Sequence, residues 1–146
     1  MRRSFSEKTE KTGMKKHILL VDDDKDELII FMDALRRVPA EDGFKCTYAS
    51  STSQAIEMLK YLVPDYIFAD FNIPGMNGLE FLQNVKGQQR FRSTQLLLYS
   101  MHISEETKNK SDVTGIGYLQ KTATIDLLVR KLFDLLTVEK QANDYF

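Results

Sequence analysis

The chain has 146 residues, of which 42% are hydrophobic and 28% charged, and its formal net charge is −1. This length is typical of one globular domain with a sizeable core, and the near-neutral charge gives no general reason to expect a nucleic-acid or membrane partner. No apolar stretch reaches the ~20 residues of a membrane helix, and no apolar segment of a signal peptide follows the basic N-terminus. We therefore expect a cytoplasmic protein.

The charge is nevertheless uneven along the chain. Residues 1–16 carry six basic and two acidic side chains. Such a short polar segment buries too little area to order itself, so we expect a flexible basic tail, a domain spanning 17–138 and a second short tail at 139–146. The single cysteine, Cys46, cannot form an internal disulfide, and we expect it to be an inert residue of a strand.

Five short apolar segments, each typical of a buried strand, alternate with five segments of helical character. The strands are predicted near residues 17–21, 44–49, 66–70, 95–100 and 117–120. The helices are predicted at about 24–37, from the capping cluster 51–53 to Pro64, from Asn77 and Gly78 onward, at 104–114 and at 124–137. This alternation predicts a doubly wound α/β fold, in which right-handed crossovers join five strands into one parallel sheet.

Two of these helices carry further expectations. In the second, Ala55, Ile56, Leu59 and Leu62 are expected to face the core. The fourth, 104–114, is almost wholly polar, and Val113 is its only strongly apolar residue. Because helices in proteins are stabilised chiefly by a packed apolar face, this helix is expected to be held mainly by its neighbours.

Polar residues follow three of the apolar segments directly. Asp22, Asp23 and Asp24 follow the first strand, Asp70 follows the third and Ser100 the fourth. In an open α/β sheet the chemistry lies beyond the carboxyl ends of the strands, so these side chains are expected to share one crevice. Several carboxylates in one crevice repel each other and favour a hard divalent cation with oxygen ligands.

Four motifs in this order resemble the receiver domain of two-component response regulators, and the likeness covers nearly all of 17–138. They are VDDD at 21–24, ADFNIPGMNGLEFL at 69–82, LYS at 98–100 and GYLQK at 117–121. The resemblance implies a flavodoxin-like five-stranded sheet with the strand order 2-1-3-4-5.

The resemblance also implies roles for the acidic residues. Asp70 is the expected phosphoacceptor, since a carboxylate can attack a phosphoryl group directly. Asp23 and Asp70 are expected to bind Mg²⁺, or alternatively Mn²⁺, with the backbone carbonyl of Asn72, while Asp22 acts through a water molecule. Asp24 is expected to be a solvated residue of the N-terminal turn of the first helix, and Asp26 and Glu27 to lie on the surface of that helix.

Three further positions match residues that act on the phosphoryl group in this family. Lys121 is expected to pair with the acceptor carboxylate and then with a phosphoryl oxygen. Ser100 is expected to hydrogen-bond the phosphoryl group and move toward it, and Tyr118 to rotate with that movement.

Three other positions stand out near these motifs. Thr122 stands where the family commonly has proline after a cis bond, so we expect a trans bond or a rearranged loop. Met101 stands where a small residue is usual, and we expect its bulk to narrow access for a phosphodonor. His102 is expected to be a surface residue of the loop.

The acidic run has two other interpretations, which the sequence excludes. Asp22, Asp24 and Asp26 have the spacing that opens a calcium-binding EF-hand, but that loop needs glycine where Glu27 stands. Asp22 and Asp24 also fit the D-x-D pair of a haloacid-dehalogenase-type phosphatase, which needs a longer chain. A dinucleotide-binding fold is excluded too, because no glycine-rich turn follows the first strand.

The resemblance thus implies a single-domain response regulator that catalyses only phosphoryl transfer to Asp70 and hydrolysis from it. The phosphodonor is expected to be a sensor histidine kinase or a phosphotransfer protein. The output is expected to be contact with a downstream target protein, without nucleic acid or membrane, by a monomer or weak dimer. The alternative is a receiver-like scaffold or interaction module that is not phosphorylated.

Overall fold

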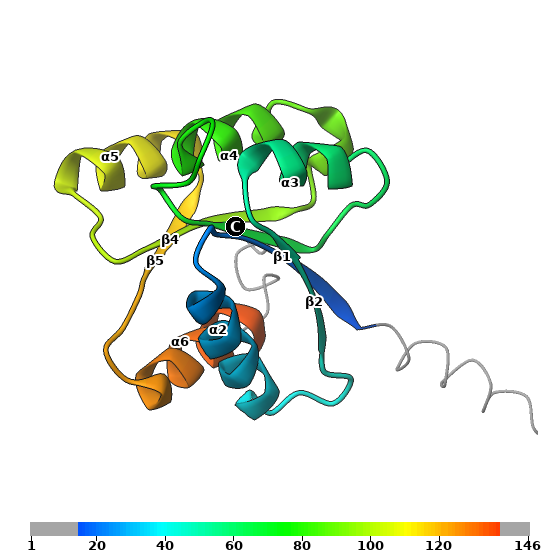
Figure 1. Cartoon of the computed structure of the whole chain (residues 1–146), viewed down its shortest axis with the longest axis vertical. Helices are drawn as coiled ribbons and strands as arrows, with labels where there is room; N and C mark the ends of the chain where they lie inside the picture. The colour runs from blue at the N-terminus through cyan, green and yellow to red at the C-terminus, as the bar shows by residue number, and fades with distance from the viewer. Residues whose placement is uncertain (1–14, 138–146) are drawn as a thin grey trace, which may run out of the picture.

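The computed structural model describes residues 15–137, so the tails expected at 1–16 and 139–146 lie almost wholly outside the described residues. Within this range, strands and helices alternate along the chain (Figure 1). The elements are β1 (Lys16–Val21), α2 (Lys25–Arg37), β2 (Phe44–Ala49), α3 (Thr52–Met58), β3 (Tyr66–Ala69), α4 (Gly78–Lys86), the 3-10 helix η1 (Gln89–Phe91), β4 (Gln95–Ser100), α5 (Glu105–Thr114), β5 (Gly117–Gln120) and α6 (Ile125–Thr137).

The five strands form one parallel sheet in the order β2-β1-β3-β4-β5. Val21, the last residue of β1, lies opposite Ala49 of β2 and Ala69 of β3, and Ser100 of β4 lies opposite Gln120 of β5. This arrangement confirms the flavodoxin-like fold expected from the sequence. Because the strands are parallel and in register, their carboxyl ends form a single edge.

Helices cover both faces of the sheet, with α2 and α6 on one face and α3, α4 and α5 on the other (Figure 1). Successive strand residues point to opposite faces. Ile18 and Leu20 therefore pack toward α2 and α6, whereas Leu19 and Val21 pack toward α3 and α4. The three central strands β1, β3 and β4 are buried on both faces, which explains why they are continuous apolar segments in the sequence.

Polar side chains that follow the strands begin the helices. In each case a side-chain oxygen accepts a hydrogen bond from a backbone N–H in the first helical turn, which would otherwise have no partner. The pairs are Asp24 with Asp26 at 2.9 Å, Ser51 with Gln54 at 3.1 Å, Asn77 with Glu80 at 2.9 Å, and Ser104 with Thr107 at 3.1 Å. Asp24 is exposed at the start of α2, as expected, and the structure adds that it caps this helix.

The second helix differs from its prediction. It ends at Met58 instead of Pro64, and Ile56, which we expected in the core, is 45% exposed. The guanidinium of Arg90 donates hydrogen bonds to the backbone carbonyls of Leu59 and Lys60, just beyond the end of the helix. These carbonyls therefore have a hydrogen-bond partner that is distant in the sequence, and the helix ends earlier than predicted.

The polar fourth helix does form, as α5. Ser111 is its only buried residue, and Val113 is 87% exposed. The helix ends at Gly115, whose positive φ of 80° is a conformation that favours glycine. Among residues 15–137, no helix combines the length and the apolar character needed to cross a membrane.

Candidate functional site

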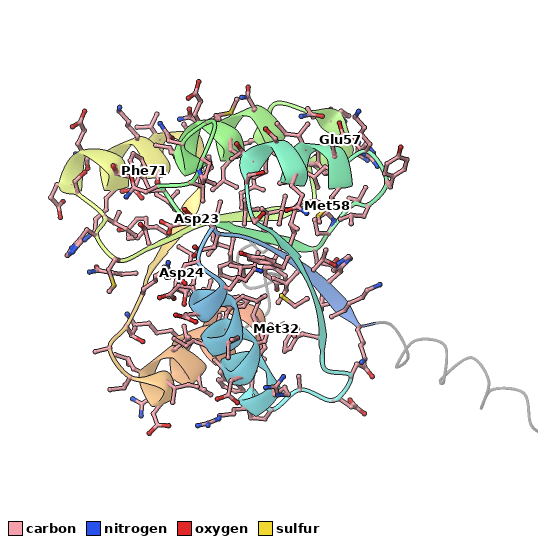
Figure 2. The ribbon with its side chains drawn as sticks, viewed as in Figure 1. Asp23, Asp24, Met32, Glu57, Met58 and Phe71 are labelled. Carbon is pink, nitrogen blue, oxygen red and sulfur yellow. The ribbon has the colours of Figure 1, made fainter. Side chains whose placement is uncertain are left out.

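Three carboxylates meet where β1 and β3 end. One side-chain oxygen from each of Asp22, Asp23 and Asp70 lies within 4.8 Å of the other two. The sheet sets this spacing, because the backbone N–H of Asp70 donates to the carbonyl of Val21 at 3.0 Å. Figure 2 shows Asp23 at the end of β1, between the two helical layers. The shared crevice expected from the sequence is therefore present.

Asp22 is the buried member of this cluster and is fully inaccessible to solvent. Its Oδ1 accepts a hydrogen bond from the backbone N–H of Asp24 at 3.0 Å, and its Oδ2 accepts one from Lys121 Nζ at 2.9 Å. Burial raises the pKa of the Asp22 carboxyl, and the hydrogen bond from Lys121 opposes this shift only in part. Asp23, by contrast, is exposed.

Lys121 places one ammonium group among several acidic side chains. Its Nζ lies 2.9 Å from Asp22 Oδ2, 3.2 Å from Asp70 Oδ2 and 3.8 Å from Glu27 Oε1. The same ammonium lies 5.2 Å from the ring centroid of Tyr99, which is buried beneath it. Burial alone would lower the pKa of Lys121, but the hydrogen bonds and charges of Asp22 and Asp70 together raise it above its ordinary value.

Asp70 is held through both of its side-chain oxygens. Its Oδ1 accepts a hydrogen bond from Ser100 Oγ at 2.9 Å and a longer one from the backbone N–H of Asn72 at 3.3 Å, while Oδ2 faces Lys121. The side chain is 14% exposed, so one side of the carboxylate remains accessible. A carboxylate held between a hydroxyl and an ammonium has donors already in place for an incoming group with negatively charged oxygens.

Glycine is required where the loop after Asp70 ends and α4 begins. A Cβ atom on Gly78 would lie 2.0 Å from the backbone carbonyl oxygen of Asp70. The backbone N–H of Gly78 donates to the carbonyl of Phe71 at 2.9 Å, so the loop closes directly beneath the acidic cluster. Only a residue without a side chain permits this close approach.

Glu27 was expected on the surface of the helix, and that expectation is wrong. Its side chain is 22% exposed and reaches into the site, 3.8 Å from Lys121 Nζ. Burial raises the pKa of this carboxyl, and the nearby Lys121 ammonium lowers it less. An acidic residue in the first turn of a helix is typical of a solvated position, so no sequence pattern indicated this contact.

Other predicted residues surround the cluster without entering it. Tyr118 is 39% exposed, and Lys108 Nζ lies 5.7 Å from the centroid of its ring. Met101 is 57% exposed and His102 is exposed, as expected of a loop residue.

Every peptide bond within 15–137 is trans, including the one between Lys121 and Thr122. Burial raises the pKa of the Cys46 thiol to about 11, which agrees with an inert residue.

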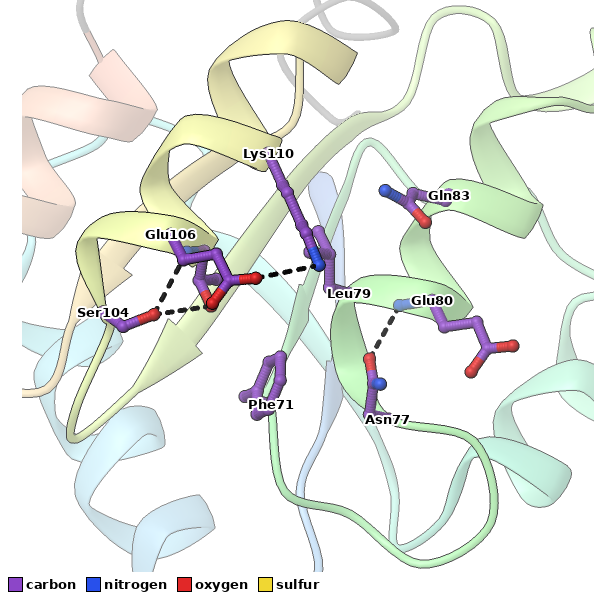
Figure 3. A pocket seen from close by; sticks show the side chains of 9 residues that line it. Phe71, Asn77, Leu79, Glu80, Gln83, Ser104, Glu106 and Lys110 are labelled. Carbon is purple, nitrogen blue, oxygen red and sulfur yellow. Dashed lines mark hydrogen bonds and ion pairs between the residues drawn. The ribbon is translucent and has the colours of Figure 1, made fainter.

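A separate groove of 670 Å³ lies between α4 and α5 (Figure 3). Phe71, the residue after Asp70, forms part of its wall. Among the polar groups drawn there, Glu106 and Lys110 lie 3.7 Å apart, and Asn77 and Ser104 cap their own helices. The groove therefore brings together no reactive groups, and the chemistry of the molecule is centred on the acidic cluster.

The fold and the site together define a receiver domain: a doubly wound parallel sheet with an acidic cluster, a lysine and a hydroxyl at its carboxyl edge. A sequence profile of the response regulator receiver domain matches residues 18–133, and the chain belongs to this family.

Among known proteins, chemotaxis protein CheY-3 of Vibrio cholerae serotype O1 is 30% identical over 117 residues, which are 79% of this chain and 87% of that protein. The phosphorylated cyanobacterial phytochrome response regulator RcpA superposes with a TM-score of 0.75 at 22% identity, over 86% of this chain and 98% of that chain. The Mn²⁺-bound form of response regulator Rcp1 gives 0.72 at 19% identity, over 86% and 96%. The two structural likenesses establish the fold.

Proposed function

We propose that this receiver domain accepts a phosphoryl group on Asp70 from a histidine kinase or a phosphotransfer protein. The observation that carries the proposal is the position of Asp70 between Ser100 Oγ at 2.9 Å and Lys121 Nζ at 3.2 Å, beside two more carboxylates. A carboxylate with these neighbours is a nucleophile whose charge-stabilising groups are already in place. The 30% identity to a chemotaxis protein over most of both chains supports the same role.

The acidic cluster fits a divalent cation. Asp22, Asp23 and Asp70 offer oxygen ligands that approach within 4.8 Å of one another, and hard cations such as Mg²⁺ and Mn²⁺ prefer oxygen. In the proposed site Asp23 and Asp70 hold the cation with the backbone carbonyl of Asn72, and Asp22 acts through water. The cation supplies positive charge that offsets the charge of the transferring phosphoryl oxygens. The Mn²⁺-bound structure of Rcp1 shows that a protein of this fold binds such an ion.

The proposed transfer needs only one bond to form and one to break. A side-chain oxygen of Asp70 attacks phosphorus, and the bond between phosphorus and the imidazole nitrogen of the donor breaks. The electron pair of that bond remains on the imidazole, which takes up a proton. Lys121 exchanges its contact with the Asp70 carboxylate for one with a phosphoryl oxygen, and the Ser100 hydroxyl donates to another.

The protein acts in this account as a phosphoacceptor that signals through contacts with other proteins. Its own groups catalyse transfer to Asp70 and later hydrolysis of the acyl phosphate, and it turns over no separate substrate. Tyr118, exposed on β5 beside α5, is the proposed reporter of the phosphorylated state, and a downstream target protein would bind near it.

Intact-mass measurement tests this function. Incubation with phosphoramidate and Mg²⁺ should add one phosphoryl group to the wild-type protein and none to Asp70→Asn. The matched control is Asp126→Asn, because this carboxylate is 94% exposed on α6 and should leave labelling unchanged. If no small donor and no histidine kinase adds mass, the alternative of an unphosphorylated receiver-like scaffold is favoured.

A parallel titration tests the cation. Binding of Mn²⁺ should be lost in Asp23→Ala and little changed in Asp24→Ala, since Asp24 caps α2 through its side chain. Equal losses in both variants would contradict the proposed ligand set.

A further inference from the structure

Thr52 connects α3 to the loop that follows Asp70. It is the first residue of α3 and is 2% exposed. Its hydroxyl donates a hydrogen bond to the carbonyl of Pro74 at 3.1 Å and accepts one from the backbone N–H of Met76 at 3.1 Å. The hydroxyl therefore acts both as a donor and as an acceptor, and both of its partners belong to a loop more than 20 residues away in the sequence.

The middle of this loop is shaped around the Thr52 hydroxyl. Gly75, between Pro74 and Met76, has a positive φ of 95°, and a Cβ atom there would lie 2.7 Å from Thr52 Oγ1. The hydroxyl thus occupies the space that a side chain at position 75 would need. At its base the loop is closed by the hydrogen bond between Gly78 and Phe71. The segment that contains Asn72 is therefore fixed at the base of the loop and at its midpoint.

We propose that Thr52 is a positioning residue of the phosphoacceptor site, which holds the loop so that the backbone carbonyl of Asn72 faces the divalent cation. The inference rests on the proposed function, because it presumes a cation at the acidic cluster. Thr52 does not touch the cluster, and it acts through the hydrogen bonds to Pro74 and Met76. Backbone groups of a loop keep one conformation only while partners satisfy them, so losing the hydroxyl releases the loop.

Thr52→Val and Thr52→Ser separate this role from packing. Valine has nearly the shape of threonine but lacks the hydroxyl, whereas serine keeps the hydroxyl and loses a methyl group. Groups that orient metal ligands typically contribute 10–100-fold in affinity. We therefore expect Thr52→Val to weaken Mn²⁺ binding by about tenfold or more. Thr52→Ser should stay near the wild-type affinity, with free Mn²⁺ measured by electron paramagnetic resonance.

Ser51→Ala is the matched structural control. It removes the hydroxyl that caps α3, one residue before Thr52, and leaves the contacts with the loop in place. It should lower the free energy of unfolding without changing the affinity for Mn²⁺. Hydrogen exchange gives a second readout, since the Met76 amide should lose protection in Thr52→Val and keep it in Ser51→Ala.

The possible outcomes distinguish a failure of the positioning role from a failure of the proposed function. Wild-type affinity in Thr52→Val would overturn the positioning role and leave the proposed function standing. An equal loss of affinity in Ser51→Ala would also overturn it, because general destabilisation would then explain the effect. Failure of the wild-type protein itself to bind Mn²⁺ would overturn the cation site and this inference with it. If Thr52→Val does not fold, Thr52→Ala makes the same comparison.

Discussion

Lys121 is the residue on which the electrostatics of the unphosphorylated site depend. Its side chain is 8% exposed, and its ammonium binds the fully buried Asp22. Removing one partner of a buried ion pair leaves an uncompensated charge, so Lys121→Met should lower the free energy of unfolding by about 3 kcal/mol in metal-free buffer. Urea denaturation measures this. Lys60→Met, which removes an exposed pair with Glu57, should change stability little, and equal effects would contradict the argument.

The difference in stability between the wild type and Lys121→Met should also depend on pH. The folded-state pKa of Lys121 lies above the ordinary value of 10.5. A cation with a raised folded-state pKa stabilises the fold fully below its unfolded-state pKa, and this stabilisation is lost as pH rises through the folded-state pKa. The stability gap between the wild type and Lys121→Met should therefore stay constant from pH 8 to about 10 and narrow above that. A gap that widened above pH 10 would contradict the assigned direction.

Among the α-helices, α5 buries the fewest residues, so we expect it to have the weakest attachment to the sheet. Its only buried residue is Ser111, and the hydroxyl of that residue has no hydrogen-bond partner among the described residues. A buried hydroxyl without a partner destabilises the folded state, and alanine also favours a helix more than serine does. Ser111→Ala should therefore raise the free energy of unfolding by about 1 kcal/mol. A loss of stability in urea denaturation would show that Ser111 has a partner in solution.

Because α5 is weakly attached, a charge at the site should shift its conformation more easily than that of any other element. A switch needs an element with two accessible states, and local opening is easiest where little apolar area is buried. We expect residues 101–118 to exchange amide hydrogens faster than the rest of 17–138, and to change most with Mg²⁺ and beryllofluoride. The apolar α4 serves as the comparison. Equal protection of α4 and α5 in both states would instead favour the Asp70 loop as the moving part.

The elements show how far the sequence could predict the structure. The central strands β1, β3 and β4 were predictable because they are buried on both faces and so are continuous apolar segments, as at 95–100. The end of α3 was not, because Arg90 binds the carbonyls beyond Met58 from 30 residues away. A contact of this kind between distant segments leaves no periodic pattern in the sequence.

At the scale of the whole molecule, the strand order brings the site together. Asp22 and Lys121 are separated by 99 residues, yet both follow strands whose carboxyl ends share one edge of the sheet. That rule made Asp22, Asp23, Asp70 and Ser100 predictable as neighbours, and the resemblance to receiver domains added Lys121. Glu27 and Thr52 were not predictable, since each looked like a residue of a helix start. Their contacts with Lys121 and with the Asp70 loop depend on how helices pack, which the strand-end rule does not describe.

The central claim is that phosphate attaches to one carboxylate of this chain, and chemical identification of the modified residue tests it most directly. Borohydride reduces an acyl phosphate and converts the aspartate to homoserine, which peptide mass spectrometry detects at a single position. After treatment with phosphoramidate and Mg²⁺, we predict homoserine at position 70 and unchanged aspartate at 22 and 23. Homoserine at 22 or 23 with unmodified Asp70, or no conversion at all in protein that binds Mn²⁺, would contradict the account.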